Sequence, residues 1–180
     1  MIGSRVTKRY AQALFEAAQE SKQIDQIEKD LIFVKEIIEK SKDFSMLLLS
    51  PVIQAAEKKK IFSQLFEQKL QRLSFEFLNL LLAKGREKML TDIIWNFLRL
   101  IDDSRGVLRG ELFTAHRFSE AQIQSLRKRL DKITGKKVIL SEEEDPSLIG
   151  GFVVRLDNTV IDTSIKNQLV KMREHLILKG

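Results

Sequence analysis

The chain has 180 residues, of which 43% are hydrophobic and 31% charged, a composition typical of a folded globular protein rather than a disordered one. It contains no cysteine, which excludes disulfides, thiolate metal sites and cysteine nucleophiles. The net charge of +6 is spread along the chain: residues 1–105 hold 18 basic and 15 acidic side chains, and residues 106–180 hold 13 and 10. The basic clusters at 58–60, 127–129 and 136–137 are dispersed among acidic residues, so we favour a solvated surface over a nucleic-acid interface.

Nothing in the sequence predicts a membrane span or a targeting segment. No apolar run approaches the roughly 18 to 20 residues needed to cross a bilayer. The N-terminus lacks the apolar region of a signal peptide, and Glu16 and Glu20 are unlike a transit peptide. We therefore expect a mature cytosolic product whose role at a membrane, if it has one, is peripheral.

Up to about Ser104 the apolar residues recur every three or four positions, which predicts a series of helices. Ser4 is the expected N-cap of the first helix, which runs to about Gln19. The second helix is expected to turn one apolar stripe inward, formed by Ile24, Ile27, Leu31, Val34 and Ile38.

Four more helices follow in this region. The third, over 44–49, is expected to start at an Asp43 cap, and the fourth carries Ile61, Leu65 and Phe66. The fifth runs from about 70 to 84 and stops at Gly85, a residue suited to the left-handed C-terminal position. The sixth, from about 87 to 103, is expected to turn inward Leu90, Ile93, Ile94, Phe97 and Ile101. Short connections predict antiparallel neighbours in a six-helix bundle.

After Gly106 the pattern changes. Strands are predicted over 107–115, 137–140, 152–156 and 159–161, the last two joined by a tight turn at Asp157 and Asn158. Ser119 and Gln122 form a capping box at the start of a helix that ends at Gly135.

Two helices are predicted in this second region, and each has an apolar stripe. The first is expected to turn inward Ile123, Leu126, Leu130 and Ile133. The last helix, with caps offered by Asp162, Thr163 and Ser164, carries Ile165, Leu169, Met172 and Leu176. The predicted fold class is α+β: an N-terminal six-helix bundle over 1–105, then a small C-terminal α/β domain of order β-α-β-β-β-α over 106–180.

Side chains able to perform chemistry are scarce. His116 and His175 lack the spacing of metal ligands, and Gly150-Gly151 lacks the Lys-Ser/Thr that completes a phosphate-binding loop. The acidic run at 142–145 lacks the alternating ligands and central glycine of a calcium loop, so we interpret it as a solvated loop between two strands. We expect no catalytic residues, no cofactor and no metal site.

Two helices are more apolar than one buried stripe requires. On the first, Val6, Tyr10, Ala13 and Ala17 lie along one line while other apolar residues cover the neighbouring directions, and the fifth is apolar on nearly all sides. Such a helix is either central in its own bundle or shared between its core and a partner. The central position is the favoured interpretation. The small alanines nevertheless suit the close approach of an amphipathic partner helix to a groove lined by these two helices.

The segment 145–151, with the sequence DPSLIGG, is the other candidate surface. Pro146 restricts one backbone angle, whereas Gly150 and Gly151 allow positive φ or close packing of another backbone. A structural turn and a binding loop are equally compatible with this chemistry.

These segments resemble the delta-subunit family of F-type ATP synthases, which includes the mitochondrial oligomycin-sensitivity-conferring protein. The resemblance is carried by residues 9–15 (RYAQALF), 77–86 (FLNLLLAKGR), 145–151 (DPSLIGG) and 161–164 (IDTS), in the family's order and spacing across nearly the whole chain. Two positions depart from the family pattern: Lys84 replaces an Asn often found before the Gly-Arg pair, and Arg117 stands where the family often has Pro.

The resemblance implies a non-catalytic stator subunit. Its first domain would bind N-terminal helices of the alpha subunits in the groove of helices one and five, and its second domain would engage the C-terminal ends of the b subunits. By motif position, the groove walls would comprise Tyr10, Ala13, Leu14 and Ala17 on one side and Leu78, Leu80 and Leu81 on the other. The family's motif loop comprises Asp145, Pro146, Gly150 and Gly151.

The implied location is the cytoplasmic face of a bacterial plasma membrane or a plastid thylakoid, with attachment to the membrane only through the complex. Two other classes remain open from the residues. An RNA-binding helical factor of the antitermination type would need a clustered basic face and a salt-sensitive affinity. An enzyme with an unrecognised site would need reactive groups that the sequence does not bring together.

Overall fold

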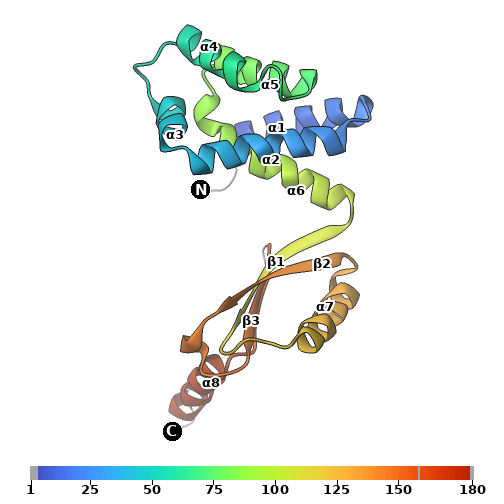
Figure 1. Cartoon of the computed structure of the whole chain (residues 1–180). Helices are drawn as coiled ribbons and strands as arrows, with labels where there is room; N and C mark the ends of the chain where they lie inside the picture. The colour runs from blue at the N-terminus through green and yellow to red at the C-terminus, as the bar shows by residue number, and fades with distance from the viewer. Residues whose placement is uncertain (1–3, 158, 179–180) are drawn as a thin grey trace. The chain divides into compact units, whose positions relative to one another are not determined.

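The computed structural model describes residues 4–157 and 159–178, with the side chains of 175–178 left out of the description. The chain divides into two compact units, Met1–Ile101 and Asp102–Gly180. The first contains α1 (Arg5–Glu20), α2 (Ile24–Lys40), α3 (Lys42–Leu49), α4 (Ala55–Phe66), α5 (Arg72–Ala83), the short 3-10 helix η1 (Glu87–Met89) and α6 (Leu90–Ser104), whose last residues belong to the second unit (Figure 1). Mixed helix and strand make the fold α+β.

The caps that begin the early helices follow local side-chain chemistry. Ser4 caps α1 as predicted, because its Oγ accepts a hydrogen bond from the Thr7 amide at 3.3 Å. The prediction that Asp43 caps α3 is wrong. Ser41 takes that position, with its Oγ accepting from the Phe44 amide at 3.2 Å, and Asp43 lies in the first turn, where its charge favours the helix N-terminus.

One hydrophobic core holds side chains from all six α-helices of the first unit. The predicted stripe of α2 is confirmed: Ile27, Leu31 and Val34 are fully buried, and the two flanking isoleucines are partly buried against the same cluster. Gly85 follows α5 with φ of +62°, and the Arg86 amide donates to the Leu81 carbonyl at 2.8 Å. This left-handed ending was also predicted, because only glycine adopts the conformation without strain.

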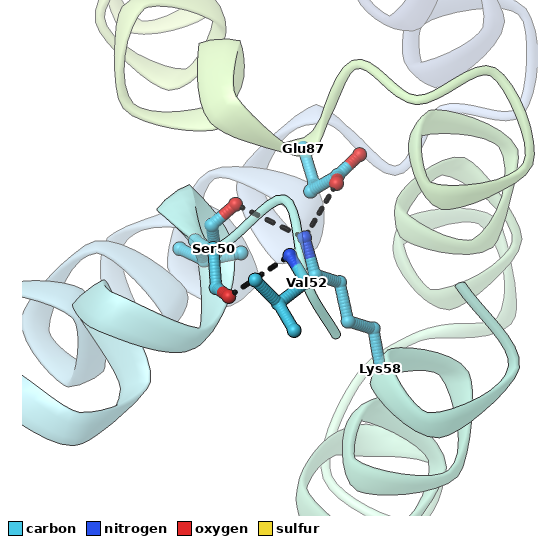
Figure 2. A network of polar contacts seen from close by, with 5 residues as sticks. Ser50, Val52, Lys58 and Glu87 are labelled. Atoms are coloured by element: carbon cyan, nitrogen blue, oxygen red, sulfur yellow. Dashed lines mark hydrogen bonds and ion pairs between the residues drawn. The ribbon is translucent and has the colours of Figure 1, made fainter. Parts of the chain in front are cut away.

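Lys58 contradicts the interpretation of the lysine cluster at 58–60 as solvated, since its exposed fraction is 2%. Its Nζ donates to the Glu87 carboxylate at 2.7 Å (Figure 2) and to the Leu48 carbonyl at 3.3 Å. Beside this pair, the Val52 amide donates to the Ser50 hydroxyl at 3.3 Å. A buried lysine needs such partners, because an uncompensated ammonium in the interior is strongly unfavourable.

The second unit is built on a four-stranded sheet. Its strands are β1 (Val107–Thr114), β2 (Lys137–Glu144), β3 (Phe152–Leu156) and β4 (Thr159–Asp162), arranged in the order β2-β1-β3-β4. β1 and β2 are parallel, and α7 (Glu120–Thr134) connects them; β3 and β4 pair antiparallel. α7 lies beside the sheet (Figure 1), and the core of this unit contains Leu112, Leu130, Val138, Leu140, Val154 and Leu156.

The start and end of α7 match the prediction, but its inward face is narrower. Ser119 and Gln122 form the capping box, and Gly135 ends the helix in the left-handed conformation. Ile123 and Leu130 are buried, whereas Ile133 is 75% exposed. The prediction that Ile133 points inward is wrong, because α7 packs against the sheet along a single narrow stripe.

The acidic run at 142–144 is not a loop. β2 continues through Glu144, and in the parallel register Leu112 pairs with Glu142 and Thr114 with Glu144. These carboxylates are exposed on an edge strand, and only Asp145 lies beyond it. Charged side chains on an edge strand discourage pairing with another chain, which gives the run a structural role that the sequence pattern did not reveal.

The last helix, α8 (Ile165–Leu178), starts as predicted, with the Ser164 hydroxyl accepting from the Asn167 amide at 3.2 Å. The described residues of its predicted apolar stripe, Ile165, Leu169 and Met172, are exposed. The side chain of Leu176 lies outside the described residues, as does Asn158 of the predicted turn.

Candidate protein-binding surfaces

The first candidate surface lies on α1 and α5. Tyr10 and Ala17 are half-buried, and Ala13 is exposed. Leu80 is a large apolar side chain that is 44% exposed. We call these four residues the α1/α5 surface. Ala13 on α1 and Leu80 on α5 each leave an apolar side chain exposed, which is the chemistry that a partner helix would cover.

Three other residues predicted for this groove lie in the core instead. Leu14, Leu78 and Leu81 are at most 2% exposed and belong to the hydrophobic core of the first unit. Their side chains are therefore not accessible at the surface. Each of the two helices turns one face to its own core and leaves apolar residues exposed on the other.

A ring contact joins the two helices beneath this surface. The Tyr10 ring meets the Phe77 ring edge-on, with centroids 6.5 Å apart and an angle of 66°. Such a contact contributes about 0.5–1.5 kcal/mol beyond the area it buries. Phe77 was absent from the predicted groove, although its place in the 77–86 motif, three residues before Leu80, puts it on the neighbouring face of α5.

The motif loop at 145–151 is a tightly constrained turn. Asp145 caps the 3-10 helix η2 (Pro146–Leu148), and its Oδ1 accepts from the Ser147 amide at 3.0 Å. Hydrogen bonds from the Ser147 hydroxyl and amide hold the pKa of Asp145 below its ordinary value. The Asp145 amide in turn donates to the Thr114 carbonyl at 2.8 Å, which ties the loop to the end of β1.

Packing accounts for one of the two glycines of the loop. A Cβ on Gly151 would lie 2.4 Å from the Thr163 carbonyl oxygen, at a φ of +75°, so this position requires glycine. A Cβ on Gly150 would lie 2.5 Å from Cδ1 of the exposed Ile165 side chain, which can move away. The structural interpretation of the loop is therefore sufficient for Gly151 alone.

Ile149 is the exception within the loop. It has a φ of +67°, an unfavourable conformation for a β-branched residue, and its side chain is 62% exposed. The Ile165 amide donates to the Gly150 carbonyl at 3.0 Å, so the loop abuts the start of α8. Exposed apolar residues thus continue from the loop onto the helix, and we call Ile149, Ile165, Leu169 and Met172 the α8 surface.

The sequence identified the apolar stripe of α8 but did not indicate that it is exposed. A helical period identifies an apolar face but not what covers it. The basic residues Lys166, Lys171 and Arg173 lie on the same helix, against one acidic residue, Glu174. An amphipathic partner with acidic flanks would match this composition.

The described residues offer no constellation for metal binding. No three histidine, aspartate or glutamate side chains among them could hold one ion together. His116 is exposed, and the side chain of His175 lies outside the description. Across the part of the chain that the structure covers, no helix is both long and apolar enough to span a bilayer.

Comparison with known proteins agrees with the resemblance. The model of the family described as ATP synthase delta (OSCP) subunit matches residues 6–176. The chain is 36% identical to the ATP synthase subunit delta of Alkaliphilus oremlandii over 171 residues, covering 95% of each chain. It is 37% identical to the protein of the same name from Desulforamulus reducens over 179 residues, covering 99% of each.

A solved structure has the same fold. A chain in the cryo-EM structure of the Toxoplasma gondii mitochondrial ATP synthase hexamer superposes with a TM-score of 0.72 at 22% identity, covering 95% of this chain and 97% of that one. At this identity the likeness concerns the fold alone. The family match and the two curated relatives together establish that the chain belongs to the ATP synthase delta (OSCP) subunit family.

Proposed function

We propose that the chain is a non-catalytic subunit of the peripheral stalk of an F-type ATP synthase, where it links the catalytic head to the b-subunit stalk so that rotation is coupled to ATP synthesis. The match of the family model over residues 6–176 carries this proposal. A linking subunit needs one partner surface toward each neighbour. Exposed apolar residues on α1 and α5 of the first unit, and on α8 of the second, supply two such surfaces.

The proposed mechanism is mechanical. A rotor turning within the head exerts torque on it, and a fixed connection must resist that torque without dissociating. Slow dissociation comes from desolvated apolar contacts at the centre of an interface. The first domain, residues 1–105, would act as a six-helix bundle whose shared core keeps the α1/α5 surface rigid. Residues 106–180 would form a separate domain that carries the α8 surface.

We assign the α1/α5 surface to an N-terminal helix of an alpha subunit. Tyr10, Ala13 and Leu80 combine exposed apolar area with small side chains, so a helix backbone can approach closely. Leu14, Leu78 and Leu81 would support this surface from within the core and make no direct contact. We assign the α8 surface to the C-terminal ends of the b subunits.

The location follows from these partners. The protein would lie at the cytoplasmic face of a bacterial plasma membrane, or in a plastid at the thylakoid, and it would contact the membrane only through the complex. A role in RNA binding has less support, because Lys58 is buried and paired with Glu87 and so leaves the basic cluster at 58–60 with two exposed lysines.

Binding of a synthetic alpha N-terminal peptide to the full chain tests the first assignment. Leu80→Asp should weaken binding by about 30-fold or more, because it places a charge at the centre of an apolar interface. Met46→Asp is the matched control: Met46 is also an exposed apolar residue of the first unit, 62% exposed on α3, and this variant should bind normally.

Tyr10 gives a second variant at the same surface. Tyr10→Asp should also weaken binding strongly, whereas Tyr10→Phe, which keeps the ring contact with Phe77, should retain it. Normal binding by a folded Leu80→Asp protein would refute the assignment. Unfolding of Tyr10→Asp together with normal binding by Leu80→Asp would favour a purely structural role for α1.

The same design applies to the second assignment. Leu169→Asp on α8 should prevent binding of a peptide from the C-terminal end of a b subunit, while Ile133→Asp, at an exposed apolar position of α7, should not. Equal binding by the two variants would contradict a role for the α8 surface in binding the stalk.

A further inference from the structure

Ile149, in the loop between β2 and β3, combines a strained backbone with an exposed apolar side chain. Its φ is +67° and its ψ is −39°, outside even the left-handed helical region, and its exposed fraction is 62%. Among the described residues, Lys22 and Asp157 are the other non-glycine residues with positive φ, and neither is β-branched. A β-branched side chain is strongly disfavoured here, because its Cβ substituents crowd the neighbouring backbone.

The residues on either side hold Ile149 in this conformation. Leu148 before it is buried, and the Ile149 amide donates to the Pro146 carbonyl at 3.2 Å. After it, the Gly150 carbonyl accepts from the Ile165 amide at 3.0 Å, and the Ile165 side chain lies against Gly150. A strained conformation persists only where the surrounding structure fixes it in this way. The same contacts place the start of α8 beside Ile149.

Glycine would suit this position better for folding alone. It has no Cβ and adopts positive φ about as readily as negative φ, and the next two residues of the loop are both glycine. An isoleucine that stabilised its own fold would bury its side chain, whereas most of Ile149 is accessible to solvent. Strained residues of this kind cluster at functional sites. The side chain therefore has its use outside the chain.

The exposed stripe of α8 continues from Ile149 and has a basic border. The stripe comprises Ile165, Leu169 and Met172. At about 100° per residue, the exposed side chains of Lys166 and Arg173 lie roughly 90° from the middle of the stripe, whereas Glu174 lies on the opposite face of the helix. Such a surface suits an amphipathic partner segment with acidic residues beside its apolar face.

We infer that Ile149 is an anchor residue of the α8 surface, held in a strained conformation so that its side chain inserts into the apolar face of the partner. The inference rests on the proposed function, which assigns this surface to the C-terminal end of a b subunit. It adds the chemistry of that partner: an amphipathic helix with an apolar pocket for Ile149 and acidic residues against Lys166 and Arg173. Stability and binding therefore place opposite demands on position 149.

The variant Ile149→Gly, made in the full-length chain, tests these opposite demands. Hydrogen exchange of the Val154 amide, in the inner strand β3, reports on the stability of the second unit. It should become about threefold slower, because glycine relieves the strain at positive φ. The affinity for a synthetic peptide from the C-terminal end of a b subunit should fall about tenfold or more, as expected when a central apolar anchor is removed.

Two control variants separate the side chain from the backbone. Ile149→Leu keeps an apolar side chain at the position and should retain most of the affinity for the peptide. Asp157→Gly also replaces a residue with positive φ in the second unit, but at the far end of β3 from the loop. It should leave binding of the peptide unchanged.

The inference is overturned if Ile149→Gly binds the peptide as tightly as the unmodified chain. It is also overturned if exchange at Val154 becomes faster in this variant, because the Ile149 side chain would then stabilise its own loop. Normal binding by Ile149→Gly together with loss of binding by Leu169→Asp would remove the anchor role alone and leave the proposed function intact. Failure of the unmodified chain to bind the peptide would instead overturn the assignment of the α8 surface to the b subunit, and the anchor role with it.

Discussion

Replacement of Lys58 by methionine should be one of the most destabilising single changes in the first unit. Methionine matches the aliphatic stem of lysine but removes the ammonium that Glu87 and the Leu48 carbonyl contact. The Lys58 and Glu87 side chains are 3% and 12% exposed, and Glu87 Oε2 already has no other partner. The variant therefore leaves a buried carboxylate without its counter-charge.

The expected loss is about 3–5 kcal/mol, the usual result of removing one partner from a buried pair. Total stabilities of 5–15 kcal/mol are typical of small domains, so the loss is a large share. With an m-value of about 1.5 kcal/mol/M, even 3 kcal/mol lowers the urea midpoint by about 2 M. Trp95, the only tryptophan in the chain, lies on α6 and reports by fluorescence on the unfolding of this unit.

Two controls make the measurement decisive. Lys59→Met changes an exposed neighbour in the same helix and should cost less than about 0.5 kcal/mol. The double variant Lys58→Met with Glu87→Leu removes both charges and should recover most of the loss, because apolar replacements of buried pairs are often nearly neutral. A Lys58→Met midpoint equal to that of Lys59→Met would refute the assignment of a buried, interacting pair.

Three further outcomes are expected. Gly151→Ala should destabilise the second unit by more than the roughly 1–2 kcal/mol expected for Gly85→Ala. Both glycines have positive φ, but only at Gly151 would an added Cβ clash with backbone atoms. Equal shifts of the urea midpoint for the two variants would contradict this. Hydrogen bonds from the Ser164 hydroxyl and amide lower the pKa of the Asp162 carboxyl. The stability that Asp162 contributes is therefore present above its unfolded pKa of about 3.9 and is lost as pH falls through its lower folded pKa. Asp162→Asn should therefore reduce the fall of the melting temperature at acid pH, and an unchanged dependence of the melting temperature on pH would contradict this role of Asp162. Replacement of Glu142–Glu144 by threonine should promote self-association through the β2 edge, visible by sedimentation velocity; a protein that stays monomeric would remove the protective role of these charges.

Much of the fold could be predicted from local patterns. Ser4, Gly85, Gly135 and the Ser119–Gln122 capping box all act as their residue types indicate, because each satisfies backbone groups within a few residues of itself. The change from helical period to short strands after Gly106 located the boundary between the two kinds of structure. The motif segments alone were enough to predict the family, and the family match confirms that prediction.

The prediction of the candidate surfaces was less complete, for one physical reason. A helical period shows which residues share a face but not whether that face meets the protein's own core or a partner. Leu14 and Leu80 both belong to helices that are more apolar than one buried stripe requires, yet Leu14 is buried and Leu80 is 44% exposed. The stripe of α8 has the same period as that of α2, but its described residues are exposed, whereas the α2 stripe packs in the core of its own unit.

Side chains that depend on distant partners could not be assigned from the sequence either. Lys58 belongs to a run of three lysines, and only the approach of Glu87, 29 positions along the chain, makes it an interior residue. The acidic residues at 142–144 became part of a strand because β1, about 30 positions earlier, offers a parallel neighbour. By itself the sequence determined the helices, most of their caps and the family, which rest on short-range chemistry. The tertiary structure decided which apolar faces remain open and which charges are buried, because both depend on contacts between segments far apart in the chain.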